Sequence, residues 1–214
     1  MIKRIIFDID NTLIGEYDFT EPVIKVLKKY NMCNSYNING FKKAMEEYDL
    51  THDYYSRSEY LNFINSHIDR RMYLDFLCEY FEELRYAVPS PIPGVKESLE
   101  NLKNAGFELV CLTNYFAKPQ RSRLETLGLS EYIDKIYGEY SSKPMKVSYL
   151  LAAGSNNMDE CVMVGDNFVL DVEVPNYLGF KTIYVTGKEE KITNKYIEVP
   201  SVSNITPKLI KSIK

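Results

Sequence analysis

The stretch Ile5-Ile6-Phe7-Asp8-Ile9-Asp10-Asn11-Thr12 decides the fold, because a short apolar run typical of a buried strand ends directly in two carboxylates. Side chains two positions apart on a strand point to the same side, so Asp8 and Asp10 are expected to share one face. Two carboxylates about 4 Å apart repel by roughly 4 kcal/mol at an effective dielectric constant of about 20. The pair therefore requires a cation or a shared proton. Mg²⁺ is suitable because it prefers oxygen ligands and commonly joins carboxylates to a substrate phosphate.

Three further segments place polar side chains at the ends of apolar runs or before a predicted helix. Leu109–Asn114 ends in Thr113 and Asn114, Ser142-Lys143-Pro144 supplies a lysine, and Val162–Asp166 ends in an acid that Asp171 follows five residues later. The apolar runs alternate with helical patterns, which predicts an α/β fold: a Rossmann-like parallel sheet with helices on both faces. In such sheets ligands bind beyond the carboxyl ends of the strands, which is where these polar residues fall.

The expected elements follow from this alternation. Strands are predicted at Arg4 to Phe7, Leu109 to Thr113, Lys135 to Tyr137, Cys161 to Val164 and Thr182 to Val185. Helices are predicted at Val95 to Asn104, Lys118 to Leu127, Met145 to Ala153, about Val169 to Tyr177, and in short form after Thr206.

Residues 15–90 break the alternation, because their apolar residues keep helical spacing throughout and no strand pattern competes. The segment ends in Pro89-Ser90-Pro91-Ile92-Pro93-Gly94, which cannot continue a helix and favours an extended linker. We therefore predict a core domain formed by residues 1–14 and 91–214, and an all-helical insert formed by residues 15–90.

The ordered series of acid pair, hydroxyl, lysine and second acid pair resembles the haloacid dehalogenase (HAD) superfamily of aspartate-nucleophile hydrolases. The motifs of that superfamily run Asp-x-Asp-x-Thr, Thr or Ser, Lys, and Gly-Asp-x-x-x-x-Asp, and all four occur here in order between Met1 and about Val185. In HAD-like proteins an insertion between the first two motifs is a cap that closes over the active site. The insert of this chain resembles the helical cap of the phosphatase-rich subgroup.

The resemblance implies a role for each motif residue. Asp8 would be the nucleophile and Asp10 the general acid and base, for which a pKa raised by the surrounding negative charge is required. Thr113, the backbone N–H of Asn114, and Lys143 would bind the phosphoryl group. Asp8, the backbone carbonyl of Asp10, and Asp166 would hold Mg²⁺, with Asp171 as an outer-shell partner. Dehalogenases of this superfamily lack the second aspartate that stands here as Asp10.

The bulk composition restricts the class of partner. The net charge is −4, hydrophobic residues make up 45% and charged residues 26% of the chain, and no apolar run approaches the length of a membrane span. These values disfavour a nucleic-acid polymer or a membrane as a partner. The N-terminus lacks the pattern of a secretory signal, and the scattered Cys33, Cys78, Cys111 and Cys161 are expected to be free thiols, so a cytoplasmic location is expected.

The expected function is a Mg²⁺-dependent phosphatase that hydrolyses a small phosphate monoester, such as a sugar phosphate or a nucleotide, through an aspartyl-phosphate. A phosphomutase shares every core residue and stays open as an alternative, as does a phosphate-sensing or partner-binding module without turnover. Tyrosines are enriched in the core segments as well as in the insert, so their number alone does not indicate a base-stacking pocket. The sequence does not distinguish a monomer from a homodimer, and it does not identify the substrate.

Overall fold

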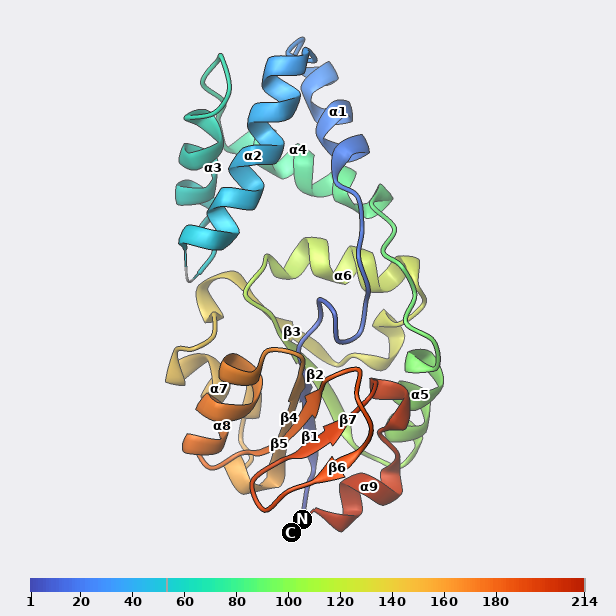
Figure 1. Ribbon diagram of the computed structural model, residues 1–214. Helices are drawn as coiled ribbons and strands as arrows, with labels where there is room; N and C mark the ends of the chain where they lie inside the picture. The colour runs from blue at the N-terminus through green and yellow to red at the C-terminus, as the bar shows by residue number, and fades with distance from the viewer. Residues whose placement is uncertain (53, 214) are drawn as a thin grey trace.

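The computed structural model describes residues 1–52 and 54–213. Its strands are β1 (Arg4–Phe7), β2 (Glu108–Leu112), β3 (Lys135–Tyr137), β4 (Cys161–Gly165), β5 (Lys181–Val185), β6 (Lys191–Ile192) and β7 (Ile197–Val199). Over the described residues they form one seven-stranded sheet in the order β3-β2-β1-β4-β5-β7-β6 (Figure 1). Neighbouring strands are parallel except for the pair of β6 and β7, which is antiparallel. The predicted α/β fold is confirmed, and β6 and β7 are additions to it.

Both faces of the sheet are buried, which explains why the central strands are continuous apolar runs. Ile5 and Phe7 of β1 pack on one side with α5 (Val95–Asn104) and α9 (Pro207–Ser212), whereas Ile6 packs on the other side with α7 (Lys146–Ala153). Burial of each such side chain contributes about 1.5–3 kcal/mol. The two apolar layers bury β1 in the interior of the sheet between β2 and β4, so that the residue after it lies well inside the carboxyl edge.

The segment after β4 differs from the single helix predicted for Val169 to Tyr177. It begins with a π-helical segment, η5 (Phe168–Glu173), and continues as the short helix α8 (Val174–Tyr177). The N–H of Val174 donates to the carbonyl of Val169, five residues back. Pro175 has no N–H with which to continue an α-helical ladder, so the wider turn is accommodated at this point.

Four helices make up most of the helical insert: α1 (Thr20–Lys29), α2 (Ser35–Thr51), α3 (Arg57–Asn65) and α4 (Leu74–Glu83), followed by the turn η1 (Leu84–Tyr86). They stand beyond the carboxyl edge of the sheet (Figure 1). The two chain segments that connect the insert to the core pair with each other, since Gly15 N donates to Ser90 O at 2.9 Å and Ser90 N donates to Glu16 O at 2.8 Å.

The insert has a hydrophobic cluster of its own, and that cluster includes two residues of the core. Tyr115 and Phe116, which lie between β2 and helix α6 (Ala117–Thr126), pack with the buried side chains of α1 to α4. The ring of Phe116 lies 4.6 Å from that of Phe81 and 5.5 Å from that of Tyr60, measured between centroids. The insert is therefore anchored on the segment that directly follows Thr113 and Asn114.

Cys111 and Cys161 are buried and Cys33 and Cys78 exposed, and all four are free thiols, as expected. Among the helices that the described residues form, none combines the length and the apolar composition that crossing a bilayer requires.

Candidate active site

The sheet brings the sequence-predicted residues together at the middle of its carboxyl edge. Phe7, the last residue of β1, lies opposite Cys111 of β2 and Val164 of β4. Asp8, Thr113 and Asp166 come directly after these three adjacent strands. Asp8 N donates to Val164 O at 2.8 Å, which ties the first acid to the strand that delivers the second.

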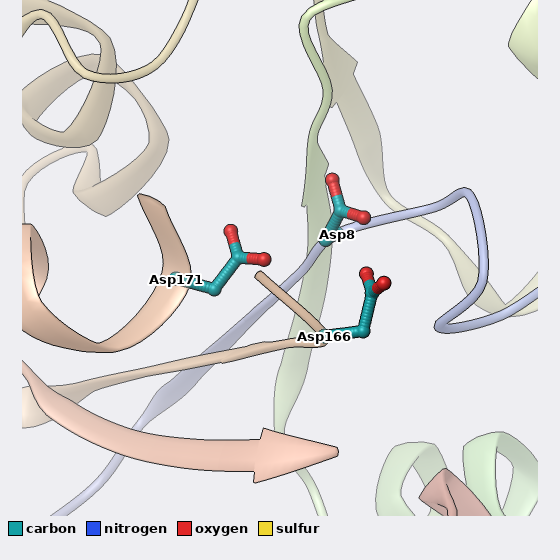
Figure 2. A group of neighbouring side chains, drawn as sticks. All are labelled: Asp8, Asp166 and Asp171. Carbon is teal, nitrogen blue, oxygen red and sulfur yellow. The ribbon is translucent and has the colours of Figure 1, made fainter. Parts of the chain in front are cut away.

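Asp8, Asp166 and Asp171 form a compact acidic group, in which each residue has a carboxylate oxygen within 4.8 Å of the others (Figure 2). Asp171 reaches the group from η5 and is fully buried. Gly165 makes this approach possible, because a Cβ at that position would lie 2.2 Å from Oδ2 of Asp171. The outer-shell role expected for Asp171 stays a prediction, since its carboxylate reaches the same space as the other two.

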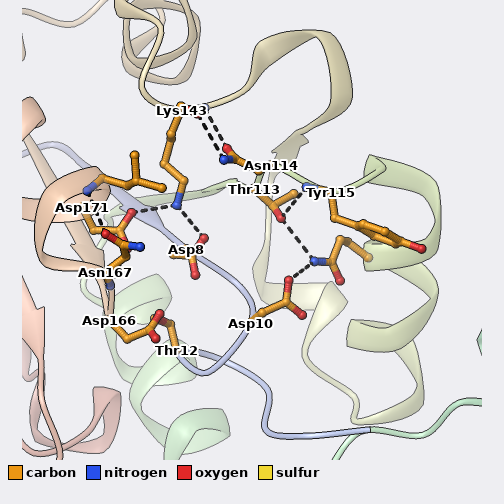
Figure 3. A network of polar contacts seen from close by, with 12 residues as sticks. Asp8, Asp10, Thr12, Thr113, Asn114, Tyr115, Lys143, Asp166, Asn167 and Asp171 are labelled. Atoms are coloured by element: carbon orange, nitrogen blue, oxygen red, sulfur yellow. Dashed lines mark hydrogen bonds and ion pairs between the residues drawn. The ribbon is translucent and has the colours of Figure 1, made fainter. Parts of the chain in front are cut away.

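Lys143 is the cation of this group, and its side chain is 3% exposed. Its Nζ donates to Oδ1 of Asp8 and to Oδ1 of Asp171, both at 2.7 Å (Figure 3). Burial acts to lower the pKa of Lys143, but the charges of Asp8 and Asp171 outweigh burial and hold that pKa above its ordinary value. One buried lysine therefore faces three carboxylates, and a divalent cation would supply the missing positive charge. This donor set of carboxylate oxygens suits Mg²⁺.

Asn114 fixes the backbone of Lys143 through its side chain. Lys143 N donates to Oδ1 of Asn114 at 2.7 Å, and Nδ2 of Asn114 donates to Lys143 O at 3.1 Å (Figure 3). From the sequence only the backbone N–H of Asn114 was expected to take part in the site, and the role of its side chain was not predicted. The β2 end and the lysine loop are thereby joined into one unit.

The side chain of Asp10 has partners different from those of the three acids. Tyr17 Oη donates to its Oδ1 at 3.2 Å, and Gln120 Nε2 donates to its Oδ2 at 2.6 Å. The pKa of Asp10 is raised mainly by burial; the charge of Arg123 opposes the rise, and that of Asp8 adds to it. The surrounding negative charge expected from the sequence is thus the smaller of the two causes that raise this pKa.

Gln120 and Arg123 of α6 are site residues that were not predicted from the sequence. Both are fully buried, and Nη1 of Arg123 donates to Oε1 of Gln120 at 3.0 Å. This hydrogen bond turns Nε2 of Gln120 toward Asp10 and toward Oγ1 of Thr113, which it reaches at 3.2 Å. The guanidinium carbon of Arg123 lies 4.1 Å from the ring centroid of Tyr17. In the sequence, Gln120 and Arg123 share helical spacing with the apolar residue Leu124. That spacing was the available signal that both side chains face the interior of the protein.

Thr12 and Asp166 close the other side of the site. Oγ1 of Thr12 donates to Oδ1 of Asp166 at 3.2 Å. Burial, and then the charge of Asp8, raise the pKa of Asp166. Asn167 N donates to Oδ2 of Asp171 at 3.0 Å, so each of the two acids after β4 accepts a hydrogen bond, one from the loop after β1 and one from its own loop.

A cavity of about 590 Å³ lies over these residues, between the sheet edge and the helical insert. Its core side is lined by Asp8, Asp10, Thr113, Lys143 and Asp166. Its insert side is lined mainly by Lys42, Met45, Glu46 and Asp49 of α2, with Tyr55 and Tyr60. A ligand held at Asp8 would thus be covered by the insert.

The chain is similar in sequence to known hydrolases. The model of the haloacid dehalogenase-like hydrolase family matches residues 5–185. A ribulose-1,5-bisphosphate 5-phosphatase of Halopiger xanaduensis is 33% identical over 116 residues, which is 52% of this chain and 46% of that protein. A phosphoglycolate phosphatase of Aquifex aeolicus is 28% identical over 193 residues, covering 85% of this chain and 83% of that protein. The chain thus matches about half the length of the first relative and most of the second.

Solved structures share the fold. YfnB, a HAD-hydrolase of Bacillus subtilis crystallised with bound magnesium, superposes with a TM-score of 0.63 at 17% identity, covering 97% of this chain and 98% of that one. The L-2-haloacid dehalogenase of Xanthobacter autotrophicus superposes with a TM-score of 0.64 at 18% identity, and each chain is covered completely.

Proposed function

The chain belongs to the haloacid dehalogenase-like hydrolases, and on this premise we propose that it is a Mg²⁺-dependent phosphatase of small phosphate monoesters. The observation that carries the proposal is the placement of Asp8 beside Lys143 and two further acids, at the floor of a cavity. This arrangement supplies a nucleophile, a fixed positive charge and a set of oxygen ligands at one point.

In the first half of the reaction a carboxylate oxygen of Asp8 attacks phosphorus, and the bond from phosphorus to the ester oxygen breaks. The leaving alkoxide takes a proton from Asp10. A protonated Asp10 is favoured because burial raises its pKa. The donors Lys143 Nζ and Thr113 Oγ1 would stabilise the negative charge on the transferring group.

In the second half a water molecule attacks the phosphorus of phosphorylated Asp8 and gives its proton to Asp10, which releases phosphate and restores both side chains. Gln120 and Tyr17 hold the carboxyl group of Asp10 on both of its oxygens. We infer that these two contacts keep Asp10 in a fixed position for both proton transfers.

The residues that would hold Mg²⁺ are Asp8 and Asp166, with the backbone carbonyl of Asp10 and with Asp171 as an outer-shell partner. When bound, the metal would offset the negative charge of the phosphate and of the acidic group. Lys143 would offset the negative charge of the carboxylates and the phosphate that remains once the metal is bound.

We further propose that residues 15–90 act as a cap over this site and that the substrate is a small phosphorylated metabolite, such as a sugar phosphate or a nucleotide. The covered cavity supports both points. The free thiols of the four cysteines support a cytoplasmic location.

The test is phosphate release from p-nitrophenyl phosphate with and without Mg²⁺, by the parent protein and by Asp8→Asn. We expect Mg²⁺-dependent release that Asp8→Asn lowers by a factor of about 10³ or more, since the covalent route is lost. The control is Asp159→Asn, the same change at an exposed position, which should keep parental turnover. Parental turnover by Asp8→Asn would overturn the proposal. Accumulation of an isomerised sugar phosphate with little free phosphate would instead identify a phosphomutase.

A further inference from the structure

The insert side of the cavity is predominantly acidic. Lys42, Glu46 and Asp49 follow one another along the face of α2 that lines the cavity, and Asp18 of the connecting segment lines it too. Nζ of Lys42 donates to Oγ1 of Thr20 at 2.8 Å. Hydrogen bonds from Thr20, and to a smaller extent the charge of Lys42, lower the pKa of nearby Asp18. Among the described residues that line this wall, Lys42 is basic and Asp18, Glu46 and Asp49 are acidic, so the formal charge of the wall is negative.

The orientation of α2 strengthens this field. The helix ends at Thr51, so Asp49 lies in its last turn, and that turn carries no basic residue. The carboxyl end of a helix carries about half a negative charge, which adds to the charge of an acid placed there. In Figure 1 the carboxyl end of α2 is the end nearer to the sheet. The part of a bound ligand that lies next to the carboxyl end of α2 is therefore exposed to negative electrostatic potential, both from the acidic side chains and from the helix backbone.

Two buried tyrosine hydroxyls border this wall, that of Tyr60 from the insert and that of Tyr115 from the core. Tyr60 is 1% and Tyr115 9% exposed, both line the cavity, and neither hydroxyl makes a hydrogen bond of ordinary geometry with the described residues. Burial chiefly raises the pKa of both hydroxyls; the charge of Arg123 opposes the rise at Tyr115, and the charge of Asp49 adds a smaller rise at both. The guanidinium carbon of Arg123 lies 5.0 Å from the ring centroid of Tyr115. The two hydroxyl oxygens are enclosed by protein groups, so a ligand in the cavity meets the tyrosine rings and not their hydroxyls.

The rings of these tyrosines form an aromatic corner with Tyr55. The ring centroid of Tyr55 lies 5.3 Å from that of Tyr60 and 4.8 Å from that of Tyr115. Aromatic faces attract ammonium groups, more strongly where water is excluded. The corner thus places ring faces beside the carboxylate of Asp49, which lines the same cavity.

We propose that the leaving group of the substrate carries a protonated amine and no second negative charge, as in the phosphate ester of an amino alcohol or an amino sugar. This inference rests on the proposed phosphatase function. An ammonium group can donate to the carboxylate of Asp49 while it contacts the rings of Tyr55 and Tyr60. A second anionic group would instead face the carboxylates of Asp18, Glu46 and Asp49.

The test compares three two-carbon phosphate esters that differ in charge: O-phosphoethanolamine, 2-hydroxyethyl phosphate and 2-phosphoglycolate. For each we would measure kcat/KM with Mg²⁺ at pH 7.5, and also the inhibition constant against p-nitrophenyl phosphate, so that binding is ranked even without turnover. The pKa of Asp49, raised to about 6 by burial and by the charge of Asp10, leaves it ionised at this pH. We expect phosphoethanolamine to be preferred over the neutral ester and the neutral ester over phosphoglycolate, each by about three- to tenfold.

The variants Asp49→Asn and Glu46→Gln test whether the acidic residues of the insert cause the preference for phosphoethanolamine over phosphoglycolate. Each should reduce the ratio between phosphoethanolamine and phosphoglycolate by about three- to tenfold, because one carboxylate charge is removed. Glu47→Gln is the matched control on the same helix, since Glu47 pairs with Lys43 and His67, and the parental ratio should persist. Thermal unfolding of each variant checks that it is folded.

Preference for phosphoglycolate, preference for the neutral ester, or a ratio that Asp49→Asn leaves unchanged would each overturn the inference. If p-nitrophenyl phosphate is hydrolysed in an Asp8-dependent reaction, such a result leaves the phosphatase proposal in place. If p-nitrophenyl phosphate is not hydrolysed at all, the proposed function and this inference fail together.

Discussion

Replacing Lys143 by methionine tests the electrostatics of the site, because the two side chains have similar length and only one carries charge. Lys143 is 3% exposed and bonded at 2.7 Å to Asp8 and to the fully buried Asp171. Removing one partner of such a buried pair costs about 3–5 kcal/mol, because the remaining carboxylates are left without compensation. For a chain of this size, 1 kcal/mol corresponds to about 2–4 °C, so we expect Lys143→Met to lower Tm by about 6 to 20 °C at pH 8.

The loss should depend on pH in a defined direction. Burial already raises the pKa of Asp171, and the charge of Lys143 opposes that rise. Without the lysine, the pKa of Asp171 in the folded protein rises further above its unfolded value of about 3.9. The folded state then binds more protons than the unfolded state above about pH 4, so stability falls as pH rises toward the folded pKa. The stability of Lys143→Met should therefore be close to that of the parent protein near pH 5, and the difference between the two should be largest near pH 8.

The assay is thermal or urea unfolding of both proteins between pH 5 and pH 8, with and without Mg²⁺. Mg²⁺ should stabilise Lys143→Met, by about 2.7 kcal/mol at a hundredfold excess over its dissociation constant, because it supplies the missing charge. Lys146→Met is the control, since Lys146 is exposed at the start of α7, and its stability should parallel the parent curve. Parallel curves for Lys143→Met and the parent across this pH range would refute the assigned role of Lys143.

Three further outcomes follow from the site. In Gln120→Leu, loss of the hydrogen bond that lowers the pKa of Asp10 should move the alkaline fall of kcat to higher pH and reduce kcat about tenfold; an unchanged pH–rate profile would contradict this. In Asn114→Ala, loss of both hydrogen bonds to the backbone of Lys143 should cost about 1–3 kcal/mol in urea unfolding and lower kcat; parental values for both would count against the positioning role. Removal of metal with EDTA should abolish phosphate release until excess Mg²⁺ is added, and full turnover in EDTA would exclude the metal requirement.

The core of the fold is readable from the sequence because its strands are buried on both faces and therefore form continuous apolar runs. Asp8, Thr113 and Asp166 were predictable as neighbours, since parallel strands bring their carboxyl ends to one edge. The strands β6 and β7 were missed because they are only two and three residues long, and Lys191 and Ile192 of β6 are exposed. Such short strands are determined by pairing with distant residues, which no local pattern records.

The inner arrangement of the site was only partly predictable, for a different reason. The sequence indicates that Asp10 is near the reacting group. It does not indicate that Gln120 contacts Asp10 or that Arg123 contacts Gln120, because these contacts depend on the position of α6 beneath the insert. The close approach of Asp171 depends on the absence of a side chain at Gly165 and on the wider turn of η5. Contacts of this kind join elements distant in sequence, and periodicity describes one element at a time.

The shared packing of Tyr115 and Phe116 limits how this protein can be recombined with its relatives. A chimera that exchanges only residues 15–90 would leave these two rings facing a foreign surface, and the guanidinium of Arg123 would lose the ring of Tyr17 against which it stacks. Grafts that also transfer positions 115, 116 and 123 keep the junction intact. In evolution the same coupling means that a new insert is accepted only together with matching changes next to Thr113 and Asn114.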